Sequence, residues 1–412
     1  MKKIMWVVSV ILLLAVAVLL WQQMQNTLYL PKETTEITIL HAWGTMEEDH
    51  KRMRDIFQDF EKEHPVRLHL LSMPSGKELL NKLEDLLQVG KVPDVVSFAG
   101  IGYNHVYEYM VQKNLALDLQ PYIEQHPSFA TNLAKQNIEK WMQNEKLYTL
   151  SDVLILSGGY WCNQDMLQKL HTSTPKTWED LFALCEAIQL YNKENGTEIY
   201  PFAFSNEAYL NIINHLFYQE HITTLRAENV SAALDLLKKL YMYSYPIRDY
   251  YTYRDETRLF NTQKTLLYMN GVWAESMIYP EIKAEYALLP YKEQSMASIT
   301  SDLAYVVGHS DNVEKTNASL QFVDYMLSEA VQQRILNQTR QVPANPKVQF
   351  PKTQNMLRLG QAVEMVQSAQ MHINNVDGIW KPNQKEVFLQ NIVPFLQNKI
   401  SKEQFLQDLQ VH

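Results

Sequence analysis

Ile37-Thr-Ile-Leu-His-Ala-Trp43, Val66-Arg-Leu-His-Leu-Leu71 and Val92-Pro-Asp-Val-Val-Ser97 are three short apolar segments of strand length near the start of the chain. The intervening residues 47–64 and 76–90 carry apolar side chains at helical spacing. A succession of strand, helix, strand, helix and strand is typical of a parallel sheet with crossover helices. The sequence therefore predicts an α/β fold that is built outward from this unit.

The order of elements changes further along the chain. Val153-Leu-Ile-Leu156 and Gly159-Tyr-Trp-Cys162 predict strands of a second sheet, whereas residues 302–308 predict a strand that returns to the first sheet. Residues 318–336 predict one helix. A chain of 412 residues is too long for one ordinary hydrophobic core. We therefore expect two domains with a hinge of several strands between them.

The composition and the motifs argue against several classes of function. The net charge is −9 and the basic residues are scattered, which disfavours nucleic acid as a partner. The sequence contains no G-x-S-x-G, no complete P-loop and no H-E-x-x-H motif. Cys162 and Cys185 belong to no metal-ligand grouping and are interpreted as buried small hydrophobic residues, although their spacing leaves a disulfide open. We therefore predict no catalytic residue, no cofactor and no metal.

The N-terminus predicts export. Lys2 and Lys3 precede the segment from Ile4 to Trp21, in which only Ser9 is polar. As a helix this segment spans roughly 27 Å, close to the hydrocarbon core of a bilayer at about 30 Å. The positive pair favours a cytoplasmic N-terminus and an extracytoplasmic remainder. Because no cysteine and no A-x-A-like site follows directly, we predict an uncleaved signal anchor and linker over residues 1–30, with cleavage left open.

A second informative segment is Thr265-Leu-Leu-Tyr-Met-Asn-Gly-Val-Trp-Ala-Glu-Ser276. It predicts a buried strand that ends at Gly271 and places Trp273 just beyond the carboxyl end of that strand. Small ligands bind at this end of the strands in open α/β sheets, and an aromatic ring beside polar groups suits an amphipathic solute. The alternative is that Trp273 only covers a hydrophobic core.

The order of these segments resembles the bacterial extracellular solute-binding proteins of family 1, the carbohydrate receptors of ABC importers. The similarity runs from about Thr38 to Leu409 and so includes nearly all of the chain after the N-terminal segment. The matching segments, in chain order, are Ile37–Trp43, Val92–Val96, Lys146–Leu150, Pro175–Trp178, Phe260–Trp273, Ala287–Pro290, Gln341–Asn345 and Ile400–Leu406.

The resemblance implies two α/β lobes of the periplasmic-binding-protein-like fold, joined by a hinge, with a cleft between them that closes around a sugar. On this basis residues 31–148 plus 298–340 form lobe 1, and residues 149–297 plus 341–412 form lobe 2. The family delivers its sugar to permease subunits in the membrane. We therefore expect a monomeric extracytoplasmic receptor, tethered by its N-terminal helix, whose ligand is an oligosaccharide.

The resemblance also implies which residues bind the ligand. Trp43 and Trp273, each placed after a strand, correspond to stacking platforms for a sugar. Asp152 and Glu275 match positions that accept hydrogen bonds from sugar hydroxyls. Asp94 lies at the strand end of the family's Pro-Asp-Val segment, where a ligand-binding and a structural role are both open. Asp302 is expected to contact the ligand in place of the missing glycine-rich loop, and Trp380 is expected to line the cleft from the second lobe.

Two departures from the family pattern leave alternatives open. Residues 295–302 stand where the family has a glycine-rich loop, and no lipid-attachment cysteine precedes the extracytoplasmic part. The missing cysteine and the uncleaved anchor also fit a membrane-tethered sugar sensor that reports to a signalling kinase. A glycan-active enzyme is the third hypothesis, because a chain with 46 acidic residues always offers carboxylate pairs, but nothing in the sequence singles out one pair.

Overall fold

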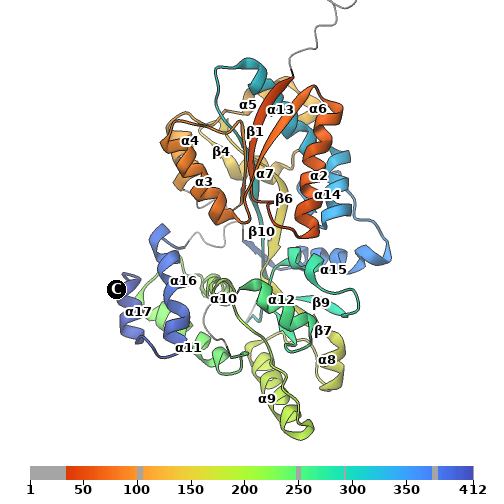
Figure 1. Cartoon of the computed structure of the whole chain (residues 1–412). Helices are drawn as coiled ribbons and strands as arrows, with labels where there is room; N and C mark the ends of the chain where they lie inside the picture. The colour runs from red at the N-terminus through yellow and green to blue at the C-terminus, as the bar shows by residue number, and fades with distance from the viewer. Residues whose placement is uncertain (1–33, 100–104, 247–251, 292–293, 374–378, 412) are drawn as a thin grey trace, which may run out of the picture.

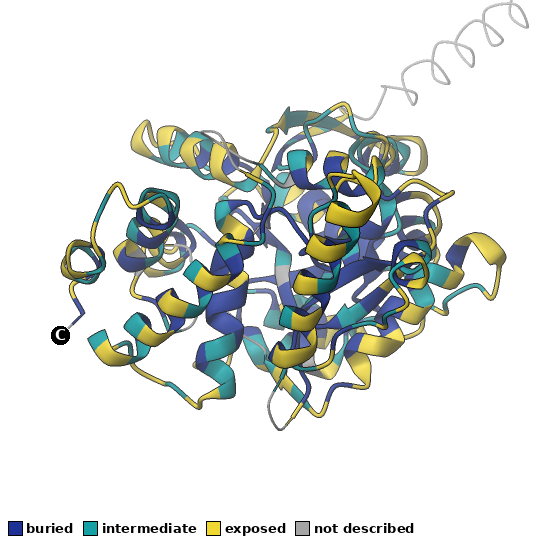
Figure 2. Ribbon diagram, turned by 90° about the horizontal axis from the view of Figure 1, so that it is seen from below, coloured by how far each residue is buried: buried dark blue, intermediate teal, exposed yellow. Residues whose placement is uncertain are grey.

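The structure is a computed structural model that describes residues 34–99, 105–246, 252–291, 294–373 and 379–411. In Figure 1 these residues form two lobes, one above the other, with long strands at their junction. Helices enclose a buried centre and turn their exposed faces outward (Figure 2). The prediction of a mixed α/β fold is therefore confirmed.

A seven-stranded sheet organises the upper lobe and continues into the junction. Its strand order is β11-β6-β10-β3-β1-β2, and β12 pairs with the start of β10. The three N-terminal strands are mutually parallel, whereas β10 runs antiparallel to both β3 and β6. The returning strand at residues 302–308 is thus confirmed. The strands are β1 (Thr35–His41), β2 (Val66–Ser72), β3 (Val95–Ala99), β6 (Leu150–Ser157), β10 (Met296–Val307), β11 (Val342–Pro343) and β12 (Met371–Ile373).

The helices of the upper lobe bury the faces that their periodicity predicts. Met53, Ile56, Phe57 and Phe60 lie on one face of α2 and are all fully buried in the core of this lobe. The upper lobe also holds a small hairpin of β4 (Met142–Gln143) and β5 (Lys146–Leu147). Its helices are α2 (Glu48–Glu63), α3 (Gly76–Gln88), α4 (His105–Gln112), α5 (Gln120–Gln125), α6 (Pro127–Ala130), α7 (Lys135–Trp141), α13 (Val313–Leu327) and α14 (Glu329–Thr339).

The single helix expected over residues 318–336 is instead two helices, α13 and α14. Ser328 adopts an extended backbone between them, and its side chain accepts a hydrogen bond from the backbone N–H of Val331. A serine at this position caps the second helix and so interrupts the first. The apolar periodicity continues on both sides of Ser328, which is why it suggested one helix.

The lower lobe is built on a three-stranded antiparallel sheet in the order β8-β7-β9. Its strands are β7 (Gly159–Asn163), β8 (Leu267–Tyr268) and β9 (Ala284–Leu288). The surrounding α-helices are α8 (Gln164–Lys169), α9 (Trp178–Asn195), α10 (Asn206–Gln219), α11 (Ala227–Tyr241), α12 (Tyr253–Asn261), α15 (Leu357–Gln367), α16 (Pro382–Leu396) and α17 (Lys402–Asp408), with 3₁₀ turns η2 (Val272–Met277) and η3 (Gln354–Met356).

Strands β6 and β10 carry the chain from one lobe to the other (Figure 1). The prediction that Val153–Leu156 belongs to the second sheet is therefore wrong, because β6 lies between β10 and β11 in the large sheet. Gly158 follows β6 with a φ of +98°, and an added Cβ would lie 2.9 Å from the Cα of Ala297. Only glycine suits this position, where the chain turns from the large sheet into β7.

Two further expectations concern the cysteines and the N-terminus. Cys162 and Cys185 are both buried and both free, as expected for small hydrophobic side chains. The membrane helix expected over residues 1–30 lies outside the described residues. Within the described ranges, no helix is both long enough and apolar enough to span a bilayer.

Candidate functional site

A small pocket lies where the two crossing strands meet the lower lobe. It is lined by the turn after β6, the first residues of β10, the end of β8 and one face of α10. Its volume of about 30 Å³ is far below the ~300–1,000 Å³ typical of a ligand pocket. This pocket therefore forms at most the floor of a solute site. Its polar lining includes Asn211, His215, Asn270 and Ser298.

Trp273 stands beside this floor, just beyond the end of β8 as the sequence predicts. Strand β8 is shorter than expected, and the chain enters η2 directly after Gly271. The indole lies over Gly271, where an added Cβ would come within 1.9 Å of the ring. The carbonyl of Gly271 accepts a hydrogen bond from Trp161 Nε1 at 3.0 Å. A glycine and a buried tryptophan thus hold the half-buried Trp273 ring at the junction.

Trp43 begins the loop after β1, on the side of the upper lobe. Its backbone N–H donates to Nδ1 of His41 at 3.1 Å, so His41 Nε2 carries the proton and donates to Ser72 Oγ at 2.9 Å. Burial, assisted by the nearby Arg54, lowers the pKa of His41 to about 3. The indole is only 7% exposed and belongs to the core of this lobe. It offers little open surface for stacking in this conformation.

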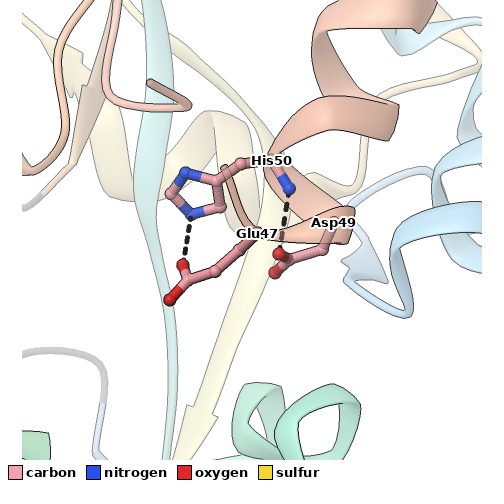
Figure 3. Close-up of side chains that lie close together, drawn as sticks. All are labelled: Glu47, Asp49 and His50. Atoms are coloured by element: carbon pink, nitrogen blue, oxygen red, sulfur yellow. Dashed lines mark hydrogen bonds and ion pairs between the residues drawn. The ribbon is translucent and has the colours of Figure 1, made fainter. Parts of the chain in front are cut away.

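Three titratable side chains gather at the start of α2, as Figure 3 shows. Ligand atoms of Glu47, Asp49 and His50 lie within 4.8 Å of one another. Burial raises the pKa of Asp49 and lowers that of His50. The spacing would suit a metal ion, but Glu47 is already paired with Arg254 on α12 at 3.2 Å. No local sequence pattern predicts this contact, because Glu47 and Arg254 are far apart along the chain.

Asp94 and Asp152 both make hydrogen bonds to other parts of the protein. Asp94 Oδ2 accepts hydrogen bonds from the backbone N–H of Thr38 at 2.7 Å and from Lys315 Nζ at 3.1 Å. It precedes β3 and so lies at the amino edge of the parallel strands, opposite the edge where Trp43 follows β1. Asp152 is 2% exposed and accepts from the Tyr305 hydroxyl at 2.6 Å, while burial raises its pKa to about 6. Neither carboxylate is open to a solute in this arrangement.

Glu275 is the centre of a buried ion-pair cluster. It is fully buried, and its carboxylate accepts hydrogen bonds from the guanidinium groups of both Arg340 and Arg358. Arg358 also donates to the backbone carbonyls of Glu275 and Ile278. The cluster joins η2, the end of α14 and α15. The expected acceptor for sugar hydroxyls is therefore engaged by two arginines, which its sequence position did not reveal.

The last two candidates lie apart from the pocket floor. Trp380 is 8% exposed, packs against Phe217 and Phe388, and donates from Nε1 to Asn214 Oδ1. It is part of the core of the lower lobe. Asp302 lies on β10, and its side chain is outside the described set. Among the predicted residues, Trp273 is thus the one that the structure places half-buried at the junction.

A larger groove of about 1110 Å³ lies elsewhere, between α9, α10 and α11. Its lining includes Trp178, which the capping box of Thr177 and Asp180 holds at the start of α9. The groove contains none of the predicted ligand residues. Size alone therefore favours this groove, whereas the position of Trp273 beyond a strand end favours the junction as the place where a solute binds.

A profile of the family described as bacterial extracellular solute-binding protein matches residues 55–356. The match includes both crossing strands and most of both lobes. The chain belongs to this family. Members of the solute-binding family bind solutes outside the cytoplasm, so the described lobes are an extracytoplasmic binding domain. No curated protein matches the sequence significantly.

Solved solute-binding proteins share the fold over nearly the whole chain. A Streptococcus pneumoniae solute-binding protein in complex with the blood group A-trisaccharide is 21% identical, with a TM-score of 0.70 over 91% of this chain and 98% of that one. A chitin oligosaccharide binding protein is 19% identical, with a TM-score of 0.74 over 91% and 97%. The GacH receptor of Streptomyces glaucescens is 17% identical, with a TM-score of 0.70 over 91% and 96%. At these identities the likeness establishes the fold.

Proposed function

We propose that this solute-binding protein is a carbohydrate receptor, with an oligosaccharide as its ligand, that captures the sugar by closing its lobes at the hinge. The observation that carries the proposal is the position of Trp273, held at the end of β8 beside the two strands that cross between the lobes. Aromatic rings at such strand ends stack on the apolar faces of sugars. Structural relatives in complex with a trisaccharide and with acarbose support the choice of ligand.

The proposed site differs from the one expected from sequence in its polar groups. Because Asp94, Asp152 and Glu275 are engaged in the scaffold, we assign the sugar hydroxyls to the amides at the pocket floor. Asn211 is exposed on α10. Asn270 follows β8, donates to the Tyr268 hydroxyl and accepts from the Gly271 N–H, which leaves one amide hydrogen and one lone pair for a solute. Amides donate and accept at once, which matches the dual character of hydroxyl groups.

The remaining assignments follow from the sequence. We assign residues 1–30 to a signal anchor and linker, residues 31–148 plus 298–340 to lobe 1, and residues 149–297 plus 341–412 to lobe 2. The receptor acts as a monomer that hands its sugar to ABC permease subunits in the membrane. It carries no catalytic activity, in keeping with a family of binding proteins.

A membrane-tethered sensor is the second candidate function, favoured by Lys2, Lys3 and the apolar segment that follows them. The two roles share the site and differ in the partner. Two neighbouring permease genes favour import, whereas a neighbouring histidine kinase gene favours sensing.

The first test is calorimetric titration of the purified protein against a panel of mono- and oligosaccharides. We expect micromolar or tighter binding of one sugar with no product formed. Trp273→Ala then weakens that binding at least about tenfold, which corresponds to about 1.4 kcal/mol, because the stacking face is lost. Tyr279→Ala is the matched control, since Tyr279 is a 53% exposed aromatic residue just after η2. Equal affinities for the two variants would remove Trp273 from the site.

A further inference from the structure

The first residues of α2 meet α12 across the junction of the lobes. Glu47 Oε1 lies 3.2 Å from Arg254 Nη2, and the two side chains are 35% and 57% exposed. Helix α2 packs into the core of the upper lobe, whereas α12 packs against the small sheet of the lower lobe. The pair therefore joins two bodies that the hinge allows to move apart.

The carboxylate of Glu47 is held in place from its own lobe. Its Oε2 accepts a hydrogen bond from Thr45 Oγ1 at 3.0 Å and lies 3.9 Å from His50 Nε2. Arg54 donates to the carbonyl of Thr45 at 2.9 Å and so fixes the loop. In Figure 3 the carboxylate of Glu47 points to the ring of His50. These contacts engage Oε2 and leave Oε1 for the opposite lobe.

Arg254 lies on α12, and hydrogen bonds fix this helix within the lower lobe. Thr252 and Asp255 form a capping box at the start of α12. One turn on, the buried Glu256 accepts a hydrogen bond from the backbone N–H of Ser205, at the start of α10. Thr257 then bonds the hydroxyl of Tyr268, which accepts in turn from Asn270 at the pocket floor. The helix thus connects the pocket floor with the contact to Glu47.

We propose that Glu47 and Arg254 form a latch between the lobes that favours their closed arrangement before a solute binds. Exposed ion pairs of this kind shift an equilibrium by up to about fivefold. When only the closed form binds tightly, the apparent affinity scales with the closed fraction. Arg254 is then an affinity-determining residue that need not touch the ligand. The expected effect on sugar affinity rests on the proposed function. The expected effect on the closed fraction of the ligand-free protein does not.

The test measures the distance between the lobes without any ligand. Spin labels are placed by Val89→Cys on the upper lobe and Leu190→Cys on the lower lobe, at positions that are 68% and 57% exposed. Both native cysteines are buried and resist labelling. Pulsed electron paramagnetic resonance then gives the distance distribution of the full-length protein and of Arg254→Gln and Glu47→Gln.

Arg258→Gln is the matched control, because Arg258 lies on the same helix, is 63% exposed and faces Asp255 one turn earlier. We expect Arg254→Gln and Glu47→Gln to raise the ratio of open to closed distances two- to fivefold at low salt, and Arg258→Gln to leave it unchanged. Sodium chloride at about 1 M should open the unaltered protein to the same extent and leave Arg254→Gln unaffected.

A charge exchange separates the latch from a general effect on folding. The double variant E47R/R254E should recover part of the closed population that each single substitution loses. Distributions that are identical in Arg254→Gln and the unaltered protein at low salt overturn the latch. An equal shift in Arg258→Gln overturns it as well. Neither result bears on sugar binding, which calorimetry decides separately.

Discussion

Among the described residues, one ionic contact around Glu275 and another between Glu47 and Arg254 join the lobes, and the two differ in almost every physical respect. Glu275 is fully buried and is shared by Arg340 and Arg358, which also bonds nearby carbonyls. Glu47 and Arg254 meet at 3.2 Å with both side chains partly in solvent. Burial makes the first contact costly to break and keeps it formed, whereas solvent screening makes the second weak enough to open. The first contact therefore suits a permanent structural role, and the second suits the proposed latch.

The largest effect is expected for Glu275→Gln. The substitution leaves the partly buried guanidinium groups of Arg340 and Arg358 without their shared, fully buried counter-charge. Removing one partner of a fully buried ion pair costs about 3–5 kcal/mol, and we expect a loss that approaches this range. Urea unfolding followed by circular dichroism measures the change. The exposed Glu281 lies on the same segment, and Glu281→Gln should stay within about 0.5 kcal/mol of the unaltered protein. A similarly small loss for Glu275→Gln would mean that the buried contact stabilises the fold no more than an exposed one does.

A smaller effect is expected from the pH dependence of the helix that carries Arg254. Burial raises the pKa of Glu256 from 4.5 to about 8. Between these values the folded protein holds a proton that the unfolded chain has released, so this contribution to stability is complete below pH 4.5 and is lost as the pH rises to 8. The loss is at most on the order of 1.4 kcal/mol per pH unit.

Glu256→Gln should remove this dependence, because an amide mimics the protonated carboxyl group. Urea unfolding at pH 5 and pH 7 compares the variant with the unaltered protein, and taking the difference cancels groups common to both, such as Asp152. The stability of the unaltered protein relative to the variant should fall between the two pH values. A constant difference would mean that Glu256 is ionised in the folded protein, and that α12 is anchored differently.

The smallest effect is expected for the latch itself. Arg254→Gln should change the free energy of unfolding by less than about 1 kcal/mol at low salt and by nothing measurable at high salt, since the pair is partly exposed. Urea titrations in about 50 mM and 1 M sodium chloride test both statements. A loss comparable with that of Glu275→Gln would show that the pair is a structural contact and not a latch.

Local sequence signals predicted well those helices and strands whose structure depends on their own residues. The buried face of α2 follows from apolar spacing, and the start of α9 follows from Thr177 and Asp180. The position of Trp273 after β8 follows from an apolar segment that ends at Gly271. The split between α13 and α14 was missed because one serine cap overrides a periodicity that continues on either side.

The candidate site was predicted less completely, because a carboxylate looks the same in sequence whatever binds it. Glu275 meets arginines 65 and 83 residues away, and Asp152 meets a tyrosine 153 residues away. No local pattern contains these partners. The same holds for Trp380, whose indole N–H finds Asn214 at a separation of 166 residues. The resemblance supplied positions for these residues but not their contacts.

The sequence by itself determined the α/β class, the succession of strands and helices, the family resemblance and the tryptophan beyond β8, because periodicity, capping and turns act within a few residues. Only the tertiary structure decided that β6 belongs to the large sheet, that three acidic candidates are engaged in the scaffold, and that Glu47 faces Arg254. Those outcomes depend on which distant segments are brought together, and the free energy of a charged group depends on its burial and its partner.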